Sequence, residues 1–340
     1  MSGAPPHPPR VRVLVVNYNS GRWLARCLES LRMQTMPEFE VVLVDNASTD
    51  ESAYPTLPDR RFRRIALPHN LGFAAGNNLA ARDAVAPWLA LLNPDAIAAP
   101  NWLDCLLEEA RRHPDYSIFG STQFRAGTAT TMDGSGDCLS LFGVTWRAGY
   151  GRPVPAVLAQ GPVLAACGAA MMIRRDWFER LGGFEERLFC YVEDVDLCLR
   201  ARLQGAQVWQ SALAQIQHVG GASTESGTSV FSLYHGNRNL IWVLTRCLPM
   251  PWLALSLPGS VAWTLLRSVL KRGSLAQRAA MLTAVRDGLA GLPATWRERA
   301  AIQSGRTADR REVLRWLSTN PLDALFRRSF RIAPKKNARP

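Results

Sequence analysis

Runs of apolar, often β-branched residues alternate with amphipathic stretches over the first part of the chain. The apolar runs predict four buried strands, at residues 11–16, 40–44, 62–67 and 88–92. Apolar residues recur at helical spacing after the first run, and a small-residue helix is expected to end at about Asp83. This rhythm predicts an α/β fold with a doubly wound, mostly parallel sheet.

Two helix starts carry residues suited to capping. Ser20 precedes the apolar positions Trp23 to Leu31 and is expected to be the N-cap of the first helix. Ser48 and Glu51 have the spacing of a capping box, which predicts a short helix after the second strand.

The pattern is less regular after residue 100. It predicts helices at 100–113, 177–184, 193–205 and 231–245, strands at 117–124, 164–173 and 208–209, and a strand end with a glycine turn at 216–221. Residues 125–162 are rich in Gly, Thr and Pro and lack periodicity, so we expect loops that cover a substrate cleft.

Positive charge is concentrated towards the end of the chain. The 340 residues, 47% hydrophobic, suffice for one large or two ordinary domains. The net charge is +12, but residues after 245 include 18 Lys/Arg and 5 Asp/Glu, a net of +13, which leaves −1 for the rest. A cationic region of this kind attracts nucleic acid or anionic lipid. Seven scattered cysteines without a CxxC pair fit reduced thiols in a cytoplasmic protein.

Residues 247–266 contain no charged residue and have the length of a membrane span. Pro249, Pro251 and Pro258 interrupt the segment, and basic residues flank it, which favours an interfacial segment at an anionic membrane. A buried hairpin against the preceding domain agrees equally well with the spacing. We expect further basic amphipathic helices up to 331, with disordered tails at 1–10 and 332–340.

Polar residues follow three of the predicted strands, at Asn17–Asn19, Asp45–Asn46 and Asn93–Asp95. Ligands bind at the carboxyl ends of the strands in such sheets. These groups can accept hydrogen bonds from a pyrimidine and from ribose hydroxyls, and Asp95, behind Pro94, suits a hard divalent cation on a diphosphate. The segment 70–77 adds a glycine-rich helix start that can face phosphate. Any single asparagine here can instead serve a turn or a cap.

A second acidic cluster lies at Glu193, Asp194 and Asp196. Acids in the first turn of a helix stabilise it through the helix dipole, which accounts for two of the three. Repulsion among them should raise one pKa towards the range of a catalytic base. His218 is either structural or, if Asp95 binds a metal, a further ligand of that metal.

The ordered motifs resemble the family 2 glycosyltransferases, most closely the rhamnosyltransferase-like branch, over residues 11–246. They are Val16-Asn17-Tyr18-Asn19-Ser20, Val44-Asp45-Asn46-Ala47-Ser48-Thr49-Asp50, Asn70-Leu71-Gly72-Phe73-Ala74-Ala75-Gly76-Asn77, Asn93-Pro94-Asp95, Gly168-Ala169-Ala170-Met171, Glu193-Asp194-Val195-Asp196 and His218-Val219-Gly220-Gly221. The resemblance implies a GT-A domain at 11–246. The charge and composition of residues 247–331 predict a basic, helical, membrane-associating extension after it. The resemblance also implies a nucleotide-sugar donor, a divalent cation (Mg²⁺ or Mn²⁺) and inversion at the anomeric carbon.

Roles for individual residues follow from the same resemblance. Asp194 would be the general base beside Glu193, Asp95 and His218 would bind the metal, and Asp45 would bind the nucleotide base. Donor binding would involve Asn17, Asn19, Asp45, Asn46, Asn70, Gly72, Asn77 and Asn93, and acceptor binding would involve Gly168 and Ala169. Asn93 replaces the first acid of the family's Asp-x-Asp motif, which should weaken metal affinity. Asp196 is expected to pair with Arg200 at helical spacing instead.

The expected activity is transfer of one sugar, rhamnosyl from dTDP-rhamnose, to a lipid-linked or polysaccharide acceptor in cell-surface glycan synthesis. The enzyme would be cytoplasmic and peripherally bound to the inner face of the cell membrane. A UDP-hexose-dependent transferase of the same family, or an inactive nucleotide-sugar-binding or membrane-associated protein, is the alternative. A dehydrogenase would need Gly-x-Gly-x-x-Gly after the first strand, where this chain has Asn17-Tyr18-Asn19-Ser20. A nucleic-acid-binding protein would leave the acidic sites unexplained.

Overall fold

The computed structural model describes residues 8–128, 130–220, 229–270, 273–329 and 331–332. Its strands are β1 (Val11–Asn17), β2 (Phe39–Asp45), β3 (Phe62–Ala66), β4 (Trp88–Leu92), β5 (Ala96–Ala98), β6 (Ile118–Arg125), β7 (Met132–Gly134), β8 (Asp137–Leu139), β9 (Thr145–Arg147), β10 (Gly161–Pro162), β11 (Ala170–Arg174) and β12 (Val208–His218). The α-helices are α1 (Arg22–Arg32), α2 (Gly72–Ala81), α3 (Trp102–Arg112), α4 (Arg175–Arg180), α5 (Glu193–Leu203), α6 (Val230–Cys247), α7 (Trp252–Leu270), α8 (Leu275–Ala290), α9 (Leu292–Ser304), α10 (Arg310–Trp316) and α11 (Pro321–Leu325). Two 3₁₀ turns, η1 (Glu51–Ala53) and η2 (Glu186–Leu188), complete the elements.

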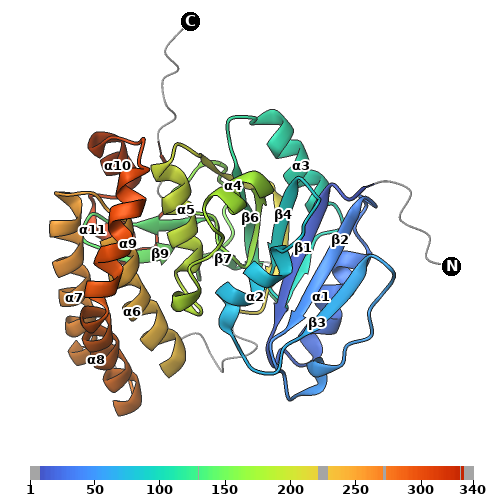
Figure 1. Cartoon of the computed structure of the whole chain (residues 1–340), viewed down its shortest axis with the longest axis horizontal. Coiled ribbons are helices and arrows are strands. Elements are labelled where there is room, and N and C mark those ends of the chain that lie inside the picture. The colour runs from blue at the N-terminus through green and yellow to red at the C-terminus, as the bar shows by residue number, and fades with distance from the viewer. Residues whose placement is uncertain (1–7, 129, 221–228, 271–272, 330, 333–340) are drawn as a thin grey trace, which may run out of the picture.

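The central sheet has the strand order β10-β12-β6-β11-β4-β1-β2-β3, with β5 paired to β12 and β7 to β6 (Figure 1). Strands β1 to β4 are mutually parallel, β12 is parallel to β6, and β11 runs antiparallel between β4 and β6. This order brings the carboxyl ends of β1, β2 and β4 to one edge. The predicted mostly parallel sheet is confirmed.

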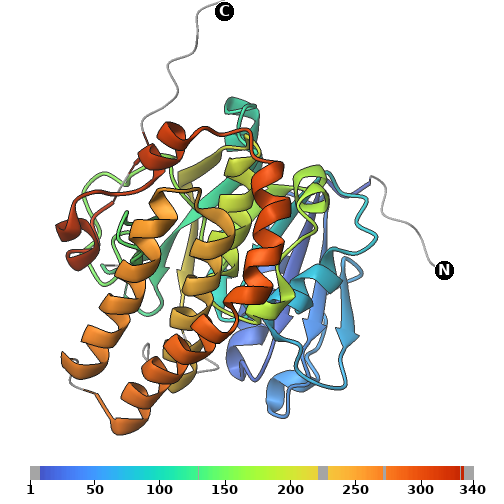
Figure 2. The same ribbon diagram turned by 60° about the vertical axis from the view of Figure 1, so that its left-hand side comes forward.

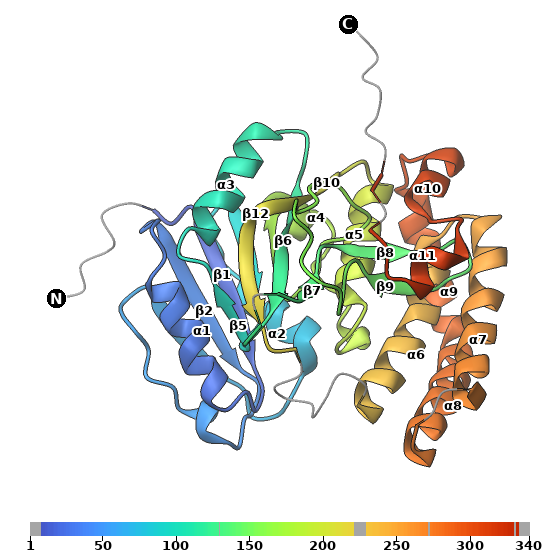
Figure 3. The ribbon, with the colours of Figure 1, turned by 180° about the vertical axis from the view of Figure 1, so that it is seen from behind.

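Helices cover both faces of the sheet, because successive residues of each strand point to opposite sides. Val13 and Val15 of β1 pack in one core with α1 and α3, and Leu14 and Val16 pack in the other with α2, α4 and α5. Figure 3 shows α1 in front of the sheet in the view from behind, where α2 lies on the far side. The predicted doubly wound arrangement is therefore confirmed.

Both capping predictions are wrong, because the hydroxyl groups of Ser20 and Ser48 form hydrogen bonds with the Asn17 side chain. Gly21 is the N-cap of α1, and the hydroxyl of Ser20 donates to the side chain of Asn17. Asp50 caps η1 by accepting from the Ser52 amide at 3.0 Å. The hydroxyl of Ser48 accepts from Asn17 instead, at 3.0 Å, so it makes no capping box with Glu51.

Three boundaries in the second half also differ from the prediction. Residues 125–162 contain the short strands β7 to β10, which at two or three residues are too short to show alternation. Residues 164–169 form a loop, and β11 begins only at Ala170. The two segments around 208 and 216 are one strand, β12, with a register shift between Gln210 and Gln215.

The predicted tails are ordered where they meet the fold. The Arg10 amide donates to the Glu38 carbonyl at 2.8 Å, and the Ile332 amide donates to the Pro162 carbonyl at 3.0 Å. The rest of both tails, 1–7 and 333–340, lies outside the described residues. Helix α7 continues through Pro258, which has no amide hydrogen to donate to the Ala254 carbonyl one turn earlier.

Candidate active site

Asn17 joins the carboxyl ends of β1 and β2. Its side-chain amide donates to Asp45 Oδ1 at 3.1 Å, to Ser48 Oγ at 3.0 Å and to Ser52 Oγ at 3.0 Å. Asn17 and Asp45 are both buried. The structure therefore brings together two side chains that the sequence placed at neighbouring strand ends.

The second oxygen of Asp45 accepts from Arg64 Nη2 of β3 at 2.8 Å. Arg64 was missed in the sequence analysis, although its position near the end of the third strand predicts that it faces the same edge. Each Asp45 oxygen keeps a further lone pair that can accept from a base. Asn19 lies close by, and its side-chain oxygen accepts from the Thr49 amide at 2.8 Å.

Asn46 and Asn70 hold the turn that begins α2. Asn46 donates to the Gly72 carbonyl at 3.1 Å and accepts from the Leu71 amide at 2.8 Å, and Asn70 accepts from the Gly72 amide at 2.8 Å. Gly72 has φ of 87°, and a Cβ there would lie 2.6 Å from the Phe189 carbonyl oxygen. These three residues shape the backbone, which is the turn role left open by the sequence.

Asn77 lies within α2 and is 1% exposed. Its amide donates to the Phe73 carbonyl at 2.9 Å, and its side-chain oxygen accepts no hydrogen bond in the part of the chain that the structure describes.

Asp95 and His218 lie side by side where β4 ends and β12 ends. His218 Nε2 is 3.2 Å from Asp95 Oδ1 and 3.2 Å from Asn93 Nδ2, and all of these atoms come from segments held by backbone pairing. Burial alone would lower the pKa of His218, but the charges of Asp95 and Asp133 outweigh it and raise the pKa to about 9. Two predicted metal ligands, remote in the sequence, thus share one location.

Asp133 holds the other side of the same imidazole. Its Oδ2 lies 2.8 Å from His218 Nδ1 and 2.8 Å from Arg147 Nη1. Burial would raise the pKa of Asp133, but the hydrogen bond from His218 and the charge of Arg147 outweigh it and lower the pKa. A carboxylate on the far nitrogen fixes the orientation of a metal-binding histidine.

The donor set suits a divalent cation. Asp95 supplies a carboxylate and His218 an imidazole, and the buried side-chain oxygen of Asn93 has no hydrogen-bond partner among the described residues. Oxygen ligands with one imidazole fit Mg²⁺ or Mn²⁺. Asp95, His218 and Asn93 are therefore the residues that fit the expected cation.

Asp194 is held by two backbone amides at the start of α5. Gly168 N donates to its Oδ2 at 2.8 Å and Val195 N to its Oδ1 at 2.8 Å, and the residue is partly exposed. The next residue of the loop, Ala169, accepts from the Asn93 amide at 2.9 Å. Residues 168 and 169, predicted for acceptor binding, thus connect Asp194 to the end of β4.

The other acids of the cluster differ in environment. Glu193 is buried, and burial together with the charge of Asp194 raises its pKa well above the ordinary value. Asp196 is fully buried and pairs with Arg200 Nε at 2.7 Å, which confirms the predicted helical pair. Its pKa, which burial would raise, is lowered by the charges of Arg200 and Arg246.

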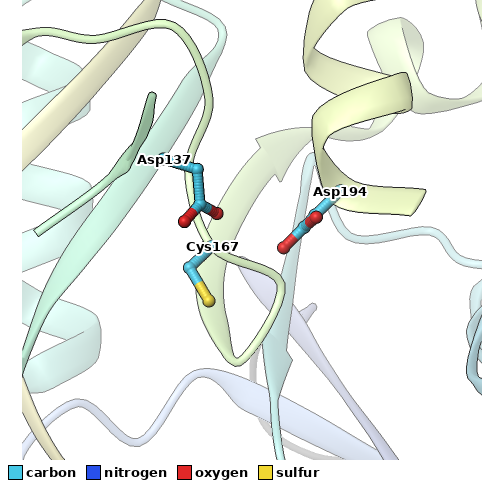
Figure 4. Close-up of side chains that lie close together, drawn as sticks. All are labelled: Asp137, Cys167 and Asp194. Carbon is cyan, nitrogen blue, oxygen red and sulfur yellow. The ribbon is translucent and has the colours of Figure 1, made fainter. Parts of the chain in front are cut away.

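Asp137 of β8 faces Asp194 across the thiol of Cys167 (Figure 4). The ligand atoms of these three residues lie within 4.8 Å of one another. Burial, followed by the charge of Asp194, raises the pKa of Asp137, and burial raises that of Cys167. Both groups therefore favour the protonated form, as His218 does with its raised pKa, so a cation at either place would have to displace a proton.

Asp133, Asp137 and Arg147 were not predicted as site residues, because the irregular pattern of their segment indicated loops. The signal was present as two acids four residues apart among glycines, in Asp133-Gly134-Ser135-Gly136-Asp137. Arg147 links the two halves of the site, since it lies 2.8 Å from Asp133 and 3.8 Å from Asp137.

The turn before Asp194 is strained. Phe189, Tyr191 and Val192 have φ of 63°, 71° and 70°, a region that such residues rarely adopt. Asn239 of α6, which is fully buried, donates to the carbonyls of Leu188, Cys190 and Tyr191 at 2.7, 2.9 and 2.7 Å. Strain of this kind persists where the surroundings hold it.

We expect Asn239→Leu to destabilise the protein by about 1–3 kcal/mol, because buried carbonyls lose their donor. It should also lower kcat more than it raises KM, since Asp194 follows directly. Urea unfolding and steady-state kinetics measure the two effects. Asn237→Leu, two residues away on the same helix, is the control, because Asn237 donates to the Leu233 carbonyl of α6 and accepts from Thr264 of α7, and neither bond involves the turn before Asp194. Equal kcat in both variants would contradict a positioning role.

A family model described as glycosyl transferase family 2 matches residues 12–182. The O-antigen biosynthesis protein RfbC of Myxococcus xanthus is 30% identical over 237 residues, which are 63% of this chain and 18% of RfbC. The N-acetylglucosaminyl-diphospho-decaprenol L-rhamnosyltransferase of Mycobacterium tuberculosis is 29% identical over 299 residues, 79% of this chain and 92% of that protein. The chain thus spans a small part of the first relative and nearly all of the second.

Two solved structures are similar in fold. The crystal structure of S. aureus TarS 1–349 has a TM-score of 0.53 and 16% identity, covering 90% of each chain. The mannosyltransferase PcManGT from Pyrobaculum calidifontis, in complex with GDP-Man and Mn²⁺, has a TM-score of 0.50 and 18% identity, covering 88% of this chain and 86% of that one. These likenesses agree with the predicted GT-A fold.

Proposed function

The chain belongs to glycosyl transferase family 2, and we propose that it transfers one rhamnosyl group from dTDP-rhamnose to a lipid-linked acceptor in cell-surface glycan synthesis. The M. tuberculosis relative supports this choice, because its name gives a rhamnosyltransferase that acts on a saccharide carried by diphospho-decaprenol and the match covers 92% of it. A lipid-linked acceptor implies work at the inner face of the cell membrane. A UDP-hexose donor and a polysaccharide acceptor are the alternatives.

One observation carries the proposal: the Asp95–His218 pair and Asp194 belong to one connected set of polar contacts. The backbone amide of Asn93 donates to the Ala169 carbonyl at 2.9 Å. The backbone amide of the adjacent Gly168 donates to Asp194 Oδ2 at 2.8 Å. A donor diphosphate and an acceptor hydroxyl bound near these groups would be neighbours. An inactive binding protein would have no need of this arrangement.

The residues have distinct tasks in the proposed reaction. Asp194 accepts the proton of the acceptor hydroxyl as its oxygen attacks the anomeric carbon from the face opposite to the diphosphate. The amides of Gly168 and Val195 fix the orientation of that carboxylate. Asp45 binds the nucleoside, and the buried Asn17 orients its carboxylate. Asp95 and His218, with Asn93, would hold the cation, which when bound neutralises charge on the leaving diphosphate.

A thermal-shift comparison tests the donor. We expect dTDP-rhamnose with Mn²⁺ to raise Tm more than UDP-glucose or GDP-mannose, because a ligand that binds only the folded state stabilises it. A higher Tm with UDP-glucose would select the hexosyl alternative. No rise with any nucleotide sugar, while the protein unfolds cooperatively, would contradict the proposal.

A further inference from the structure

Helix α7 buries small polar residues and exposes large apolar ones. Ser256, Ser260, Thr264 and Ser268 recur at every fourth position and are buried. The opposite face exposes Leu255, Trp263, Leu265, Leu266, Val269 and Leu270. A helix packed on a globular protein in water normally shows the reverse pattern, with its apolar stripe turned inwards.

Contacts along the buried side prevent α7 from turning its apolar face inwards. Ser256 Oγ donates to the Leu141 carbonyl at 2.6 Å, and Thr264 Oγ1 donates to Asn237 Oδ1 at 3.1 Å. At Gly259 the helix comes so close to the 141–143 turn that a Cβ would lie 2.5 Å from the Phe142 carbonyl oxygen. Only the small-residue side fits this neighbour, so the apolar side remains outside.

Helix α8 extends the same surface. It packs against α7, and its Leu275, Leu282 and Leu289, spaced seven residues apart, are 82%, 50% and 42% exposed. Figure 1 shows both helices at the end of the molecule opposite β3, and Figure 2 shows them as a hairpin along one edge. We call the exposed apolar residues of α7 and α8 the outer face.

Basic groups lie at both ends of α7. A cavity of about 600 Å³ next to its start is lined by Met250 and Trp296 and by the arginines 297, 299, 306 and 310. Arg297 and Arg310 are exposed and form no ion pair between described residues, whereas Arg299 is buried and donates to the carbonyls of Thr245 and Leu248. Arg267 lies near the other end, followed in the sequence by Lys271 and Arg272. Apolar surface between basic clusters matches the interface of an anionic bilayer.

We propose that the outer face docks on an anionic lipid bilayer, with α7 lying in the boundary between headgroups and acyl chains. The exposed Arg297 and Arg310 of that cavity then meet lipid phosphates at one end of the helix. The inference rests on the proposed function only in that a lipid-linked acceptor needs such an arrangement. A second copy of this chain is a poorer occupant, because its basic clusters would face those of the first copy.

Vesicle flotation of the full chain tests the proposal. The parent protein should float with phosphatidylcholine vesicles that contain phosphatidylglycerol, and Leu266→Glu/Val269→Glu should bind them about tenfold less or weaker still. The matched control is Leu213→Glu/Val85→Glu, which adds the same charges elsewhere. The control sites are 50% and 69% exposed, against 49% and 71% for the test sites.

Three results would overturn the inference. The parent protein fails to float, or the test variant floats as well as the control, or light scattering shows a parent dimer that the test variant dissociates. The rise in Tm with nucleotide sugar is measured on the same samples and should persist in both variants. Its loss in the parent would contradict the proposed transferase and leave the docking result unaffected.

Discussion

Replacing Asp194 by asparagine is expected to lower kcat for sugar transfer by about 10²–10⁴-fold, because the acceptor hydroxyl loses its proton acceptor. Asparagine keeps an oxygen for one of the two amides that hold Asp194, those of Gly168 and Val195 at 2.8 Å each. Donor binding should therefore remain close to that of the parent. Steady-state transfer and the rise in Tm with nucleotide sugar measure the two quantities separately.

Glu193→Gln is the control for this prediction. Burial and the charge of Asp194 raise the pKa of Glu193, so the neutral amide resembles the protonated side chain already favoured there. The loss in kcat should be much smaller than for Asp194→Asn. Ordinary turnover by Asp194→Asn, or a larger loss with Glu193→Gln, would show that the base has been assigned to the wrong residue.

The fold was predictable wherever one hydrophobic pattern extended over a whole helix or strand. In β1, Val13 and Val15 enter one core and Leu14 and Val16 the other, so a continuous apolar run correctly indicated a strand covered on both faces. Parallel strands then bring their ends to one edge. For that reason the side chains of Asn17 and Asp45 could be expected to meet, and Asn17 Nδ2 lies 3.1 Å from Asp45 Oδ1.

The sequence could not predict which of several neighbouring polar side chains forms a given hydrogen bond. Ser20 and Ser48 are both good cap residues, but both of their hydroxyl groups bond to the Asn17 side chain, so Gly21 becomes the N-cap of α1 and Asp50 that of η1. Likewise, nothing near Asn46 in the sequence shows that it bonds to the turn at Leu71 and Gly72. Such choices are made by tertiary contacts between residues far apart in the chain.

Asp133 and Asp137, in the segment 125–162, could not be predicted as site residues for a different reason. Asp133 and Asp137 lie on three-residue strands, which carry no measurable period, and their partners are distant. His218 of β12 is 85 residues from Asp133, and Asp194 comes from helix α5. The site residues that follow the long strands β1, β2 and β4 could be predicted from the sequence. Those on β7, β8 and β9 became apparent only from the fold.

Asp95→Ala is expected to abolish the Mn²⁺-dependent part of donor binding, the second large effect. The substitution removes the carboxylate that lies 3.2 Å from His218 Nε2 and leaves only a neutral amide oxygen and an imidazole. Asn93 stands where a second acid would compensate, so the loss should exceed about tenfold in Mn²⁺ affinity. Electron paramagnetic resonance of free Mn²⁺ measures that affinity without any turnover.

The fold should survive this substitution, because His218 keeps its 2.8 Å contact with Asp133 and β12 keeps its pairing with β5. Asp176→Ala, at an exposed ion pair with Arg174, is the matched control and should bind Mn²⁺ like the parent. Unchanged Mn²⁺ affinity in Asp95→Ala would remove Asp95 from the cation site. It would direct attention to Asp137, Cys167 and Asp194, whose ligand atoms lie within 4.8 Å of one another. Because that group includes the proposed base, the Asp194→Asn variant would then lose Mn²⁺ as well as turnover.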